Sequence, residues 1–149
     1  MRAVAGSVVV ALALVVACGA GTTGRPDAFL AAGATEIEAE RGSSCWSLAP
    51  GRRECLDTGG PGELRGGAAL RVRRGQSVVL RFDRDDAPET LGAALDRAPV
   101  GGDDLIGVAV EPANPTSFLV DVPPGTYHLT LATGWPQGDV AFSLEIAVL

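Results

Sequence analysis

Lysine is absent from the 149-residue sequence, and histidine, tyrosine and methionine occur once each. Aromatic residues make up only 5% of the chain, and 12 arginines stand against 18 acidic residues, which gives a net charge of −6. This balance does not provide the basic surface of a nucleic-acid-binding protein. Glycine (20) and proline (10) are too few for a low-complexity chain, and the length suits one domain. A single packed domain is therefore expected.

The scarcity of histidine and methionine excludes several kinds of site. A blue copper centre uses two histidines, a free cysteine and commonly a methionine, whereas this chain offers only His128 and Met1. A serine triad needs a histidine base, but the local alternation places His128 on an outward strand face with Thr126 and Thr130. The G-x-S-x-G nucleophile motif is absent. We expect no catalytic residue, no cofactor and no enzymatic activity.

Two acidic runs are the remaining candidates for a metal site. Asp83–Asp86 and the pair Asp103-Asp104 supply the oxygen ligands that Ca²⁺ takes in proteins. Neither run matches the D-x-[DN]-x-[DN]-G calcium loop, and short charge runs are usually solvated loops. The sequence thus predicts no metal site. An envelope hydrolase or a metal-dependent enzyme with an unrecognised site remains the alternative from another class.

The amino terminus has the pattern of an export signal. Met1 and Arg2 supply positive charge, and an apolar stretch then runs from residue 3 to residue 17. This stretch is shorter than the roughly 20 residues that a membrane-spanning helix needs. It ends in Val15-Val16-Ala17-Cys18, which resembles the lipobox of bacterial lipoproteins.

The lipobox resemblance implies the location of the protein and its attachment. In that family the cysteine, here Cys18, carries diacylglycerol and becomes the first residue after cleavage, and two acyl chains suffice for stable anchoring. Lipidation would also leave Cys45 and Cys55 as an even pair. We expect a signal peptide over 1–17, a lipidated cysteine with a flexible Gly/Thr/Pro-rich spacer over 18–34, and a domain over 35–149. The domain would lie on the extracytoplasmic face of a bacterial cell membrane.

Cys45 and Cys55 flank a short segment with Pro50-Gly51 at its centre. This dipeptide is a turn signal, so the segment folds back and the two thiols can meet. Two cysteines and a single histidine do not readily complete a zinc site, and the spacing is unlike C-x-x-C. A structural disulfide is predicted, which would stabilise the domain by about 2–3 kcal/mol.

The rest of the chain shows the two-residue period of half-buried strands. Residues 68–73 and 78–83 are expected to form a hairpin with a turn at Arg74-Gly75. Further strands are expected over 90–96, 105–111, 118–122, 127–131 and 140–148. No stretch after the signal longer than two turns shows helical spacing. Seven or eight short strands separated by Gly/Pro turns predict an all-β, antiparallel immunoglobulin-like β-sandwich. A jelly roll or a C2-like sandwich is the alternative.

Two local segments resemble known proteins. The run 121–127, which ends in Tyr127, resembles the tyrosine corner before the penultimate strand of such sandwiches, where the phenol bonds to backbone upstream. The segment from Gly42 through Cys45-Trp46 to Cys55-x-Asp57 resembles uncharacterised small secreted or lipid-anchored bacterial proteins with an immunoglobulin-like sandwich. The second resemblance supports the fold and the disulfide and implies no activity.

A binding surface is predicted from two features. Alternation places Arg71, Arg73 and Arg81 on the outer face of the expected hairpin, where they would form a cationic stripe for anionic envelope polymer or lipid headgroups. Cross-strand ion pairing is the simpler explanation of the same residues. Trp135 lies in an expected turn, where an exposed ring would contact a ligand. We expect a lipid-anchored, non-catalytic binding or envelope-interaction module with an envelope polymer or protein partner, or else a purely structural envelope lipoprotein.

Overall fold

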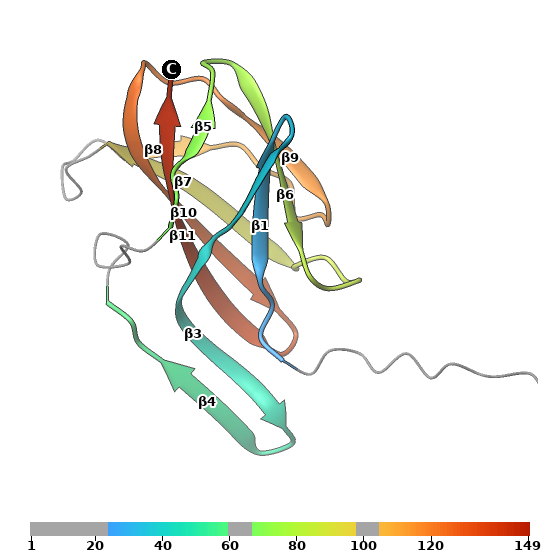
Figure 1. Cartoon of the computed structure of the whole chain (residues 1–149). Coiled ribbons are helices and arrows are strands. Elements are labelled where there is room, and N and C mark those ends of the chain that lie inside the picture. The colour runs from blue at the N-terminus through green and yellow to red at the C-terminus, as the bar shows by residue number, and fades with distance from the viewer. Residues whose placement is uncertain (1–23, 60–66, 98–104) are drawn as a thin grey trace, which may run out of the picture.

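The computed structural model describes residues 24–59, 67–97 and 105–149, and this part of the chain is built of eleven β-strands without a helix (Figure 1). The strands are β1 (Ala28–Ala32), β2 (Thr35–Glu38), β3 (Glu40–Ala49), β4 (Arg52–Leu56), β5 (Leu70–Val72), β6 (Gln76–Phe82), β7 (Thr90–Arg97), β8 (Ile106–Val108), β9 (Thr116–Val120), β10 (Gly125–Trp135) and β11 (Gly138–Val148). Within the described ranges, no helix is long and apolar enough to cross a membrane.

The strands form two sheets that pack face to face. The small sheet has the order β2-β1-β6-β9, and the large sheet has the order β4-β3-β11-β10-β7-β8, with β5 added to β11. The neighbours β1-β6-β9 correspond to the A-B-E strands of an immunoglobulin-like sandwich, and β11-β10-β7-β8 correspond to G-F-C-C′. The predicted fold class is confirmed. The strand count exceeds the expected seven or eight because residues 28–56 add β1 to β4.

Alternation along the long strands builds the core between the sheets. In β10 the buried residues recur every second position, and β11 follows the same period for most of its length. Burial of such large apolar side chains stabilises the fold by about 1.5–3 kcal/mol each. The largest fully buried side chains are Trp46, Tyr127, Phe142, Leu30, Leu70, Leu80, Leu95, Leu129, Leu131 and Ile146.

The predicted tyrosine corner is present at the start of β10. Tyr127 is buried, and its phenol donates a hydrogen bond to the backbone oxygen of Pro123 at 2.8 Å. The bond satisfies a polar atom that the core would otherwise leave without water. It also fixes the turn between β9 and β10, the penultimate strand of the sandwich.

The prediction of a flexible spacer is wrong for residues 28–34. Ala28 and Leu30 are fully buried, and β1 lies between β2 and β6 in the small sheet. The Ala-rich sequence of β1 alternates buried and half-buried residues, a strand period that small side chains made inconspicuous. The domain thus begins before residue 35. Residues 1–23, with the predicted signal and Cys18, lie outside the described part of the chain.

The expected hairpin over 68–83 is also wrong. β5 pairs in parallel with the end of β11 in the large sheet, whereas β6 pairs with β1 and β9 in the small sheet. The chain therefore crosses from one sheet to the other at the turn Arg73–Gly75, where the Gln76 N–H donates to the Arg73 oxygen at 2.9 Å. Alternation is satisfied in both arrangements, so the period alone does not identify the pairing partner.

Candidate functional site

The structure separates the three arginines of the predicted cationic stripe. Arg71 lies on β5 in the large sheet, and Arg73 is exposed in the turn that follows. Arg81 lies on β6 in the small sheet, pairs with Glu36 at 2.6 Å, and stacks 4.1 Å from the ring centre of Phe29. The prediction of a single cationic stripe is therefore wrong, because its residues belong to two sheets and Arg81 is already paired with Glu36.

The Arg81–Glu36 ion pair lies at the surface and joins β6 to β2 across the intervening strand β1. Two hydrogen bonds join the guanidinium to the carboxylate. The bond from Arg81 lowers the pKa of Glu36, and the same bond raises the pKa of Arg81. Exposed pairs of this kind add little stability. The sequence pattern left two explanations for an outward Arg81, a cationic stripe and an ion pair. The contact with Glu36 matches the ion pair.

Trp135 does not provide an exposed aromatic contact. It is the last residue of β10 and is 4% exposed. Its ring meets Trp46 edge-on at 6.0 Å between centres and Phe82 at 5.1 Å. Alternation along β10 directs Trp135 inward together with Thr133 and Leu131. The prediction that Trp135 contacts a ligand is therefore wrong.

The predicted disulfide joins β3 to β4. Cys45 and Cys55 are directly paired in the hairpin, with 4.0 Å between their Cα atoms. The turn is at Gly51, whose φ of 75° suits glycine. Trp46, the next residue, is fully buried, whereas Cys55 is exposed, so the bridge lies toward solvent and the tryptophan fills the core.

The histidine and the acidic residues are placed as surface groups. His128 is half-buried and lies in register with Asp96 and Glu145 on the neighbouring strands. Among the described residues there is no group of three side chains that could hold a metal ion.

The first acidic run is engaged in local contacts. Asp83 accepts a hydrogen bond from the Asp27 N–H at 2.7 Å, and Asp86 pairs with Arg84 at 2.7 Å. The bond from Arg84 holds the pKa of Asp86 below its ordinary value. Of the three carboxylates of this run, Asp83 therefore binds the backbone before β1, and Asp86 pairs with an arginine of the run itself. Asp103 and Asp104 lie outside the described residues.

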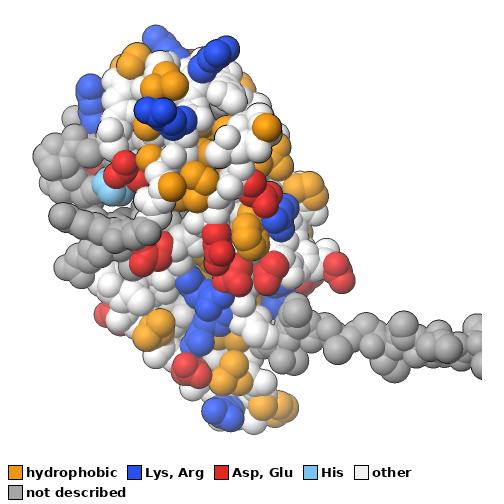
Figure 2. Space-filling view, viewed as in Figure 1, with side chains coloured by type: hydrophobic (Ala, Val, Ile, Leu, Met, Phe, Trp, Pro, Cys, Tyr) orange, Lys and Arg blue, Asp and Glu red, His pale blue; other side chains and the backbone are white. Residues whose placement is uncertain are grey.

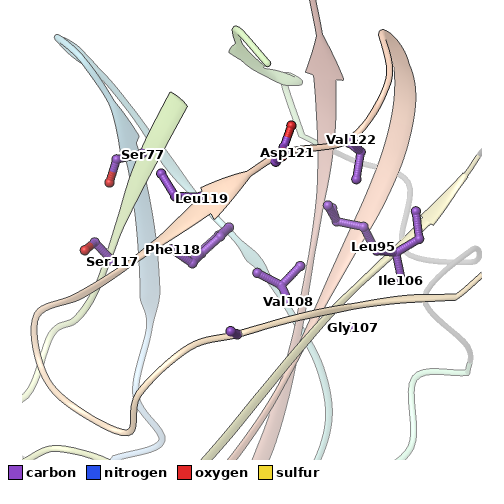
Figure 3. Close-up of a pocket in the computed structure, with 11 residues that line it drawn as sticks. Ser77, Leu95, Ile106, Gly107, Val108, Ser117, Phe118, Leu119, Asp121 and Val122 are labelled. Atoms are coloured by element: carbon purple, nitrogen blue, oxygen red, sulfur yellow. The ribbon is translucent and has the colours of Figure 1, made fainter. Parts of the chain in front are cut away.

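A groove between the edges of the two sheets is the strongest candidate site in the described part of the chain. It has a volume of about 420 Å³ and lies where β9 of the small sheet approaches β7 and β8 of the large sheet. Phe118 and Val108 point toward one another across it, while Ser117 and Leu119 lie on the other side of β9 (Figure 3). Pockets of 300–1,000 Å³ with apolar walls are typical of ligand sites.

Exposed apolar side chains surround this groove. Leu119 on β9 is 62% exposed, Leu105 is 66% exposed, and Ile106 on β8 is 38% exposed. Val79 on the neighbouring strand β6 is 42% exposed on the same outer face as Leu119. Hydrophobic side chains are also visible at the surface on the side of the molecule where β6 and β9 lie (Figure 2). Apolar surface that continues around a groove marks an interaction site rather than scattered exposure.

The strands at the two ends of each sheet order differ in how they are protected. Proteins discourage strand pairing at sheet edges with charged side chains. The edge strand β2 carries two glutamates, and β4 carries two arginines and a glutamate. By contrast, β8 reads Ile-Gly-Val and β9 reads Thr-Ser-Phe-Leu-Val, without a charge in either. The two unprotected edges are those that border the groove.

One outward position of β9 is a sequence signal for this site. Alternation over 118–122 predicts that Phe118, Val120 and Val122 share one buried face, and all three are buried in the structure. The position between the first two is Leu119, a large apolar residue where alternation requires an outward side chain. An outward leucine in a strand without charges indicates a contact surface. The groove itself depends on the approach of β8 to β9, which no local pattern encodes.

Comparison with known proteins gives no family for this chain. No protein-family model matches the sequence, and no curated protein matches it significantly.

Proposed function

We propose that the protein is a lipid-anchored, extracytoplasmic, non-catalytic module that binds an apolar polypeptide segment at the β8–β9 edge. The observation that carries the binding part is the groove of about 420 Å³ between two uncharged edge strands. The anchoring part is supported by the lipobox-like sequence that ends at Cys18. The separation of the three arginines removes the stripe that favoured an anionic polymer as the ligand, and the burial of Trp135 removes the predicted aromatic contact.

The position of the groove suits an anchored protein. Only five residues lie between Cys18 and Gly24, which limits the tether to about 20 Å even when fully extended. The described chain enters at the end of the sandwich where the β10–β11 turn lies, whereas β8 and β9 lie toward the other end (Figure 1). A domain held at its entry point would therefore present the groove away from the bilayer, where a partner can reach it.

Site-specific photocrosslinking in intact cells tests the binding part. A photoreactive amino acid replaces Leu119 in the full chain, and a matched chain carries it at Leu56, which is 49% exposed on the edge strand β4. The proposal predicts a discrete adduct with a polypeptide from position 119 and none from position 56. Adducts of equal yield at both positions, or no adduct at position 119, would contradict it.

Intact-mass measurement of the purified protein tests the anchoring part. The proposal predicts a chain that begins at Cys18 and carries the mass of diacylglycerol on that residue. A chain that retains residues 1–17, or one that begins elsewhere, contradicts the anchor without affecting the binding site.

A further inference from the structure

We propose that the partner binds β9 by strand addition, so that an extended, uncharged segment of another polypeptide becomes a fifth strand of the small sheet. This inference rests on the proposed function and specifies the form of its ligand. The small sheet ends at β9, and no described strand pairs with the outer edge of β9.

Backbone geometry identifies the groups that an added strand would meet. The Val120 oxygen accepts a hydrogen bond from the Gly75 N–H at 2.8 Å, on the side of β9 that faces β6. The pairing of β9 with β6 continues without a register shift from Thr116 to Val120. Because successive residues of an antiparallel strand direct their backbone groups to opposite edges, Ser117 and Leu119 direct theirs away from β6.

These two residues therefore offer two N–H donors and two carbonyl acceptors at the free edge. No described residue makes a backbone hydrogen bond with them on that side. The pattern of alternating donors and acceptors is complementary to an extended backbone, which is how peptides add to exposed sheet edges. A compact small molecule does not present this pattern.

The side chains beside β9 specify the chemistry of the segment. An added strand would lie about 4.8 Å from β9 and continue its alternation between the two faces. Its inward residues would enter the groove between Phe118 and Val108, where the walls are largely apolar. The one carboxylate among the lining residues, that of Asp121, is paired with Arg74 at 2.9 Å. Its outward residues would lie beside Leu119, which is 62% exposed. The segment should thus carry medium-sized apolar residues at alternate positions and no charge between them.

A second copy of this chain fits the groove less well. Two copies could pair their β9 strands about Phe118, so that Ser117 of each copy meets Leu119 of the other. The inward residues of β9, however, are buried in the core of their own copy, because Phe118 and Val120 are 3% and 0% exposed. Such a pair would satisfy the backbone groups and leave the groove unfilled.

A labelled peptide provides the test. The probe is Lys-Ser-Val-Ser-Leu-Ser-Val-Ser-Lys with a fluorophore at one end, and its matched control has the central backbone nitrogens methylated. Each is titrated against the acylated protein purified from membranes and held in lipid nanodiscs, with empty nanodiscs as the blank. Binding is measured by fluorescence anisotropy, and amide exchange is measured over 116–120 by mass spectrometry.

Two variants separate strand addition from simple apolar contact. Ser117→Pro removes an outward N–H that the fold does not use, a change that edge strands tolerate. Ser117→Ala keeps that N–H and removes the same hydroxyl. Strand addition predicts that proline weakens peptide binding about tenfold or more, whereas alanine changes it by less than about twofold. It also predicts that the bound peptide slows exchange in β9 and that the methylated peptide does not bind.

Several results would overturn the inference. Equal binding of both peptides, or equal binding to the proline and alanine variants, would show that backbone pairing is not used. If the proline variant does not fold, the comparison of the two peptides decides the question alone. A dimer in sedimentation analysis that dissociates on Ser117→Pro would identify a second copy as the occupant. An intact Leu119 crosslink together with no peptide binding would refute strand addition and leave the proposed function standing.

Discussion

Gly138 occupies a position where the structure has no room for a side chain. It is the first residue of β11, after the Pro136-Gln137 turn, and it pairs with Trp46 on β3. A Cβ atom at Gly138 would lie 2.0 Å from the backbone oxygen of Cys45 and 3.0 Å from the Trp46 Cα. Backbone atoms cannot rotate away, so Gly138→Ala must separate β3 from β11.

The conformation of Gly138 adds a second cost. Its φ is 153°, which a residue with a side chain rarely adopts. Such a backbone conformation costs about 1–3 kcal/mol, and overpacking in a closed site costs about 1–3 kcal/mol more. We therefore expect Gly138→Ala to lower the free energy of unfolding by about 2–6 kcal/mol, a large part of the 5–15 kcal/mol typical of a domain.

Gly92 on β7 is the matched control. A Cβ atom there meets no atom within 4 Å, so Gly92→Ala should change the free energy of unfolding by less than about 1 kcal/mol. Urea unfolding followed by tryptophan fluorescence, with the disulfide intact, measures both variants. If Gly138→Ala is as stable as Gly92→Ala, the close approach of β11 to β3 is wrong.

Three further substitutions test the core, the corner and the surface charge. Trp135→Ala should lower the free energy of unfolding by about 3–5 kcal/mol, since the ring is 4% exposed, and a stability change below about 1 kcal/mol would place the ring in solvent. Tyr127→Phe should cost about 1 kcal/mol through loss of the bond to Pro123, measured by urea unfolding, and no loss would refute the tyrosine corner. The pKa of Asp86 is lowered by Arg84, so this carboxylate stabilises the fold above the ordinary aspartate pKa of about 3.9 and loses that effect as the pH falls through its lower folded value. Asp86→Asn should therefore reduce the fall in stability below about pH 4, and an unchanged pH profile would contradict this pairing.

The residue pattern predicted the fold class because alternation reports which side chains face a core. The strands from β6 to β11 fall close to their expected positions, and Tyr127 makes the expected bond. β1 escaped prediction because alanine fills buried positions without a strong hydrophobic signal. The partner of β5 escaped prediction because alternation places Leu70 and Val72 on one face whichever strand lies beside them. Pairing across distant segments is a property of the whole sandwich.

The same limits of local alternation explain why the predicted binding residues do not form the candidate site. Trp135 was assigned to a turn because Pro136 follows it, yet β10 continues through Trp135 and directs its ring inward. Arg71 and Arg81 share an outward position in their own strands, but those strands belong to different sheets. Local periodicity gives the face of each side chain correctly. It does not specify which faces adjoin, and the groove beside β9 depends on that.

Thiol labelling shows directly whether a partner covers the edge of β9 in the cell envelope. Leu119→Cys and Leu149→Cys place single thiols at positions that are 62% and 63% exposed in the isolated chain. Maleimide labelling rates are compared between intact cells and purified protein. If a partner covers this edge, position 119 is labelled much more slowly in cells, while position 149 is labelled at similar rates in cells and in purified protein. Equally fast labelling of position 119 in cells would show that no partner covers this edge.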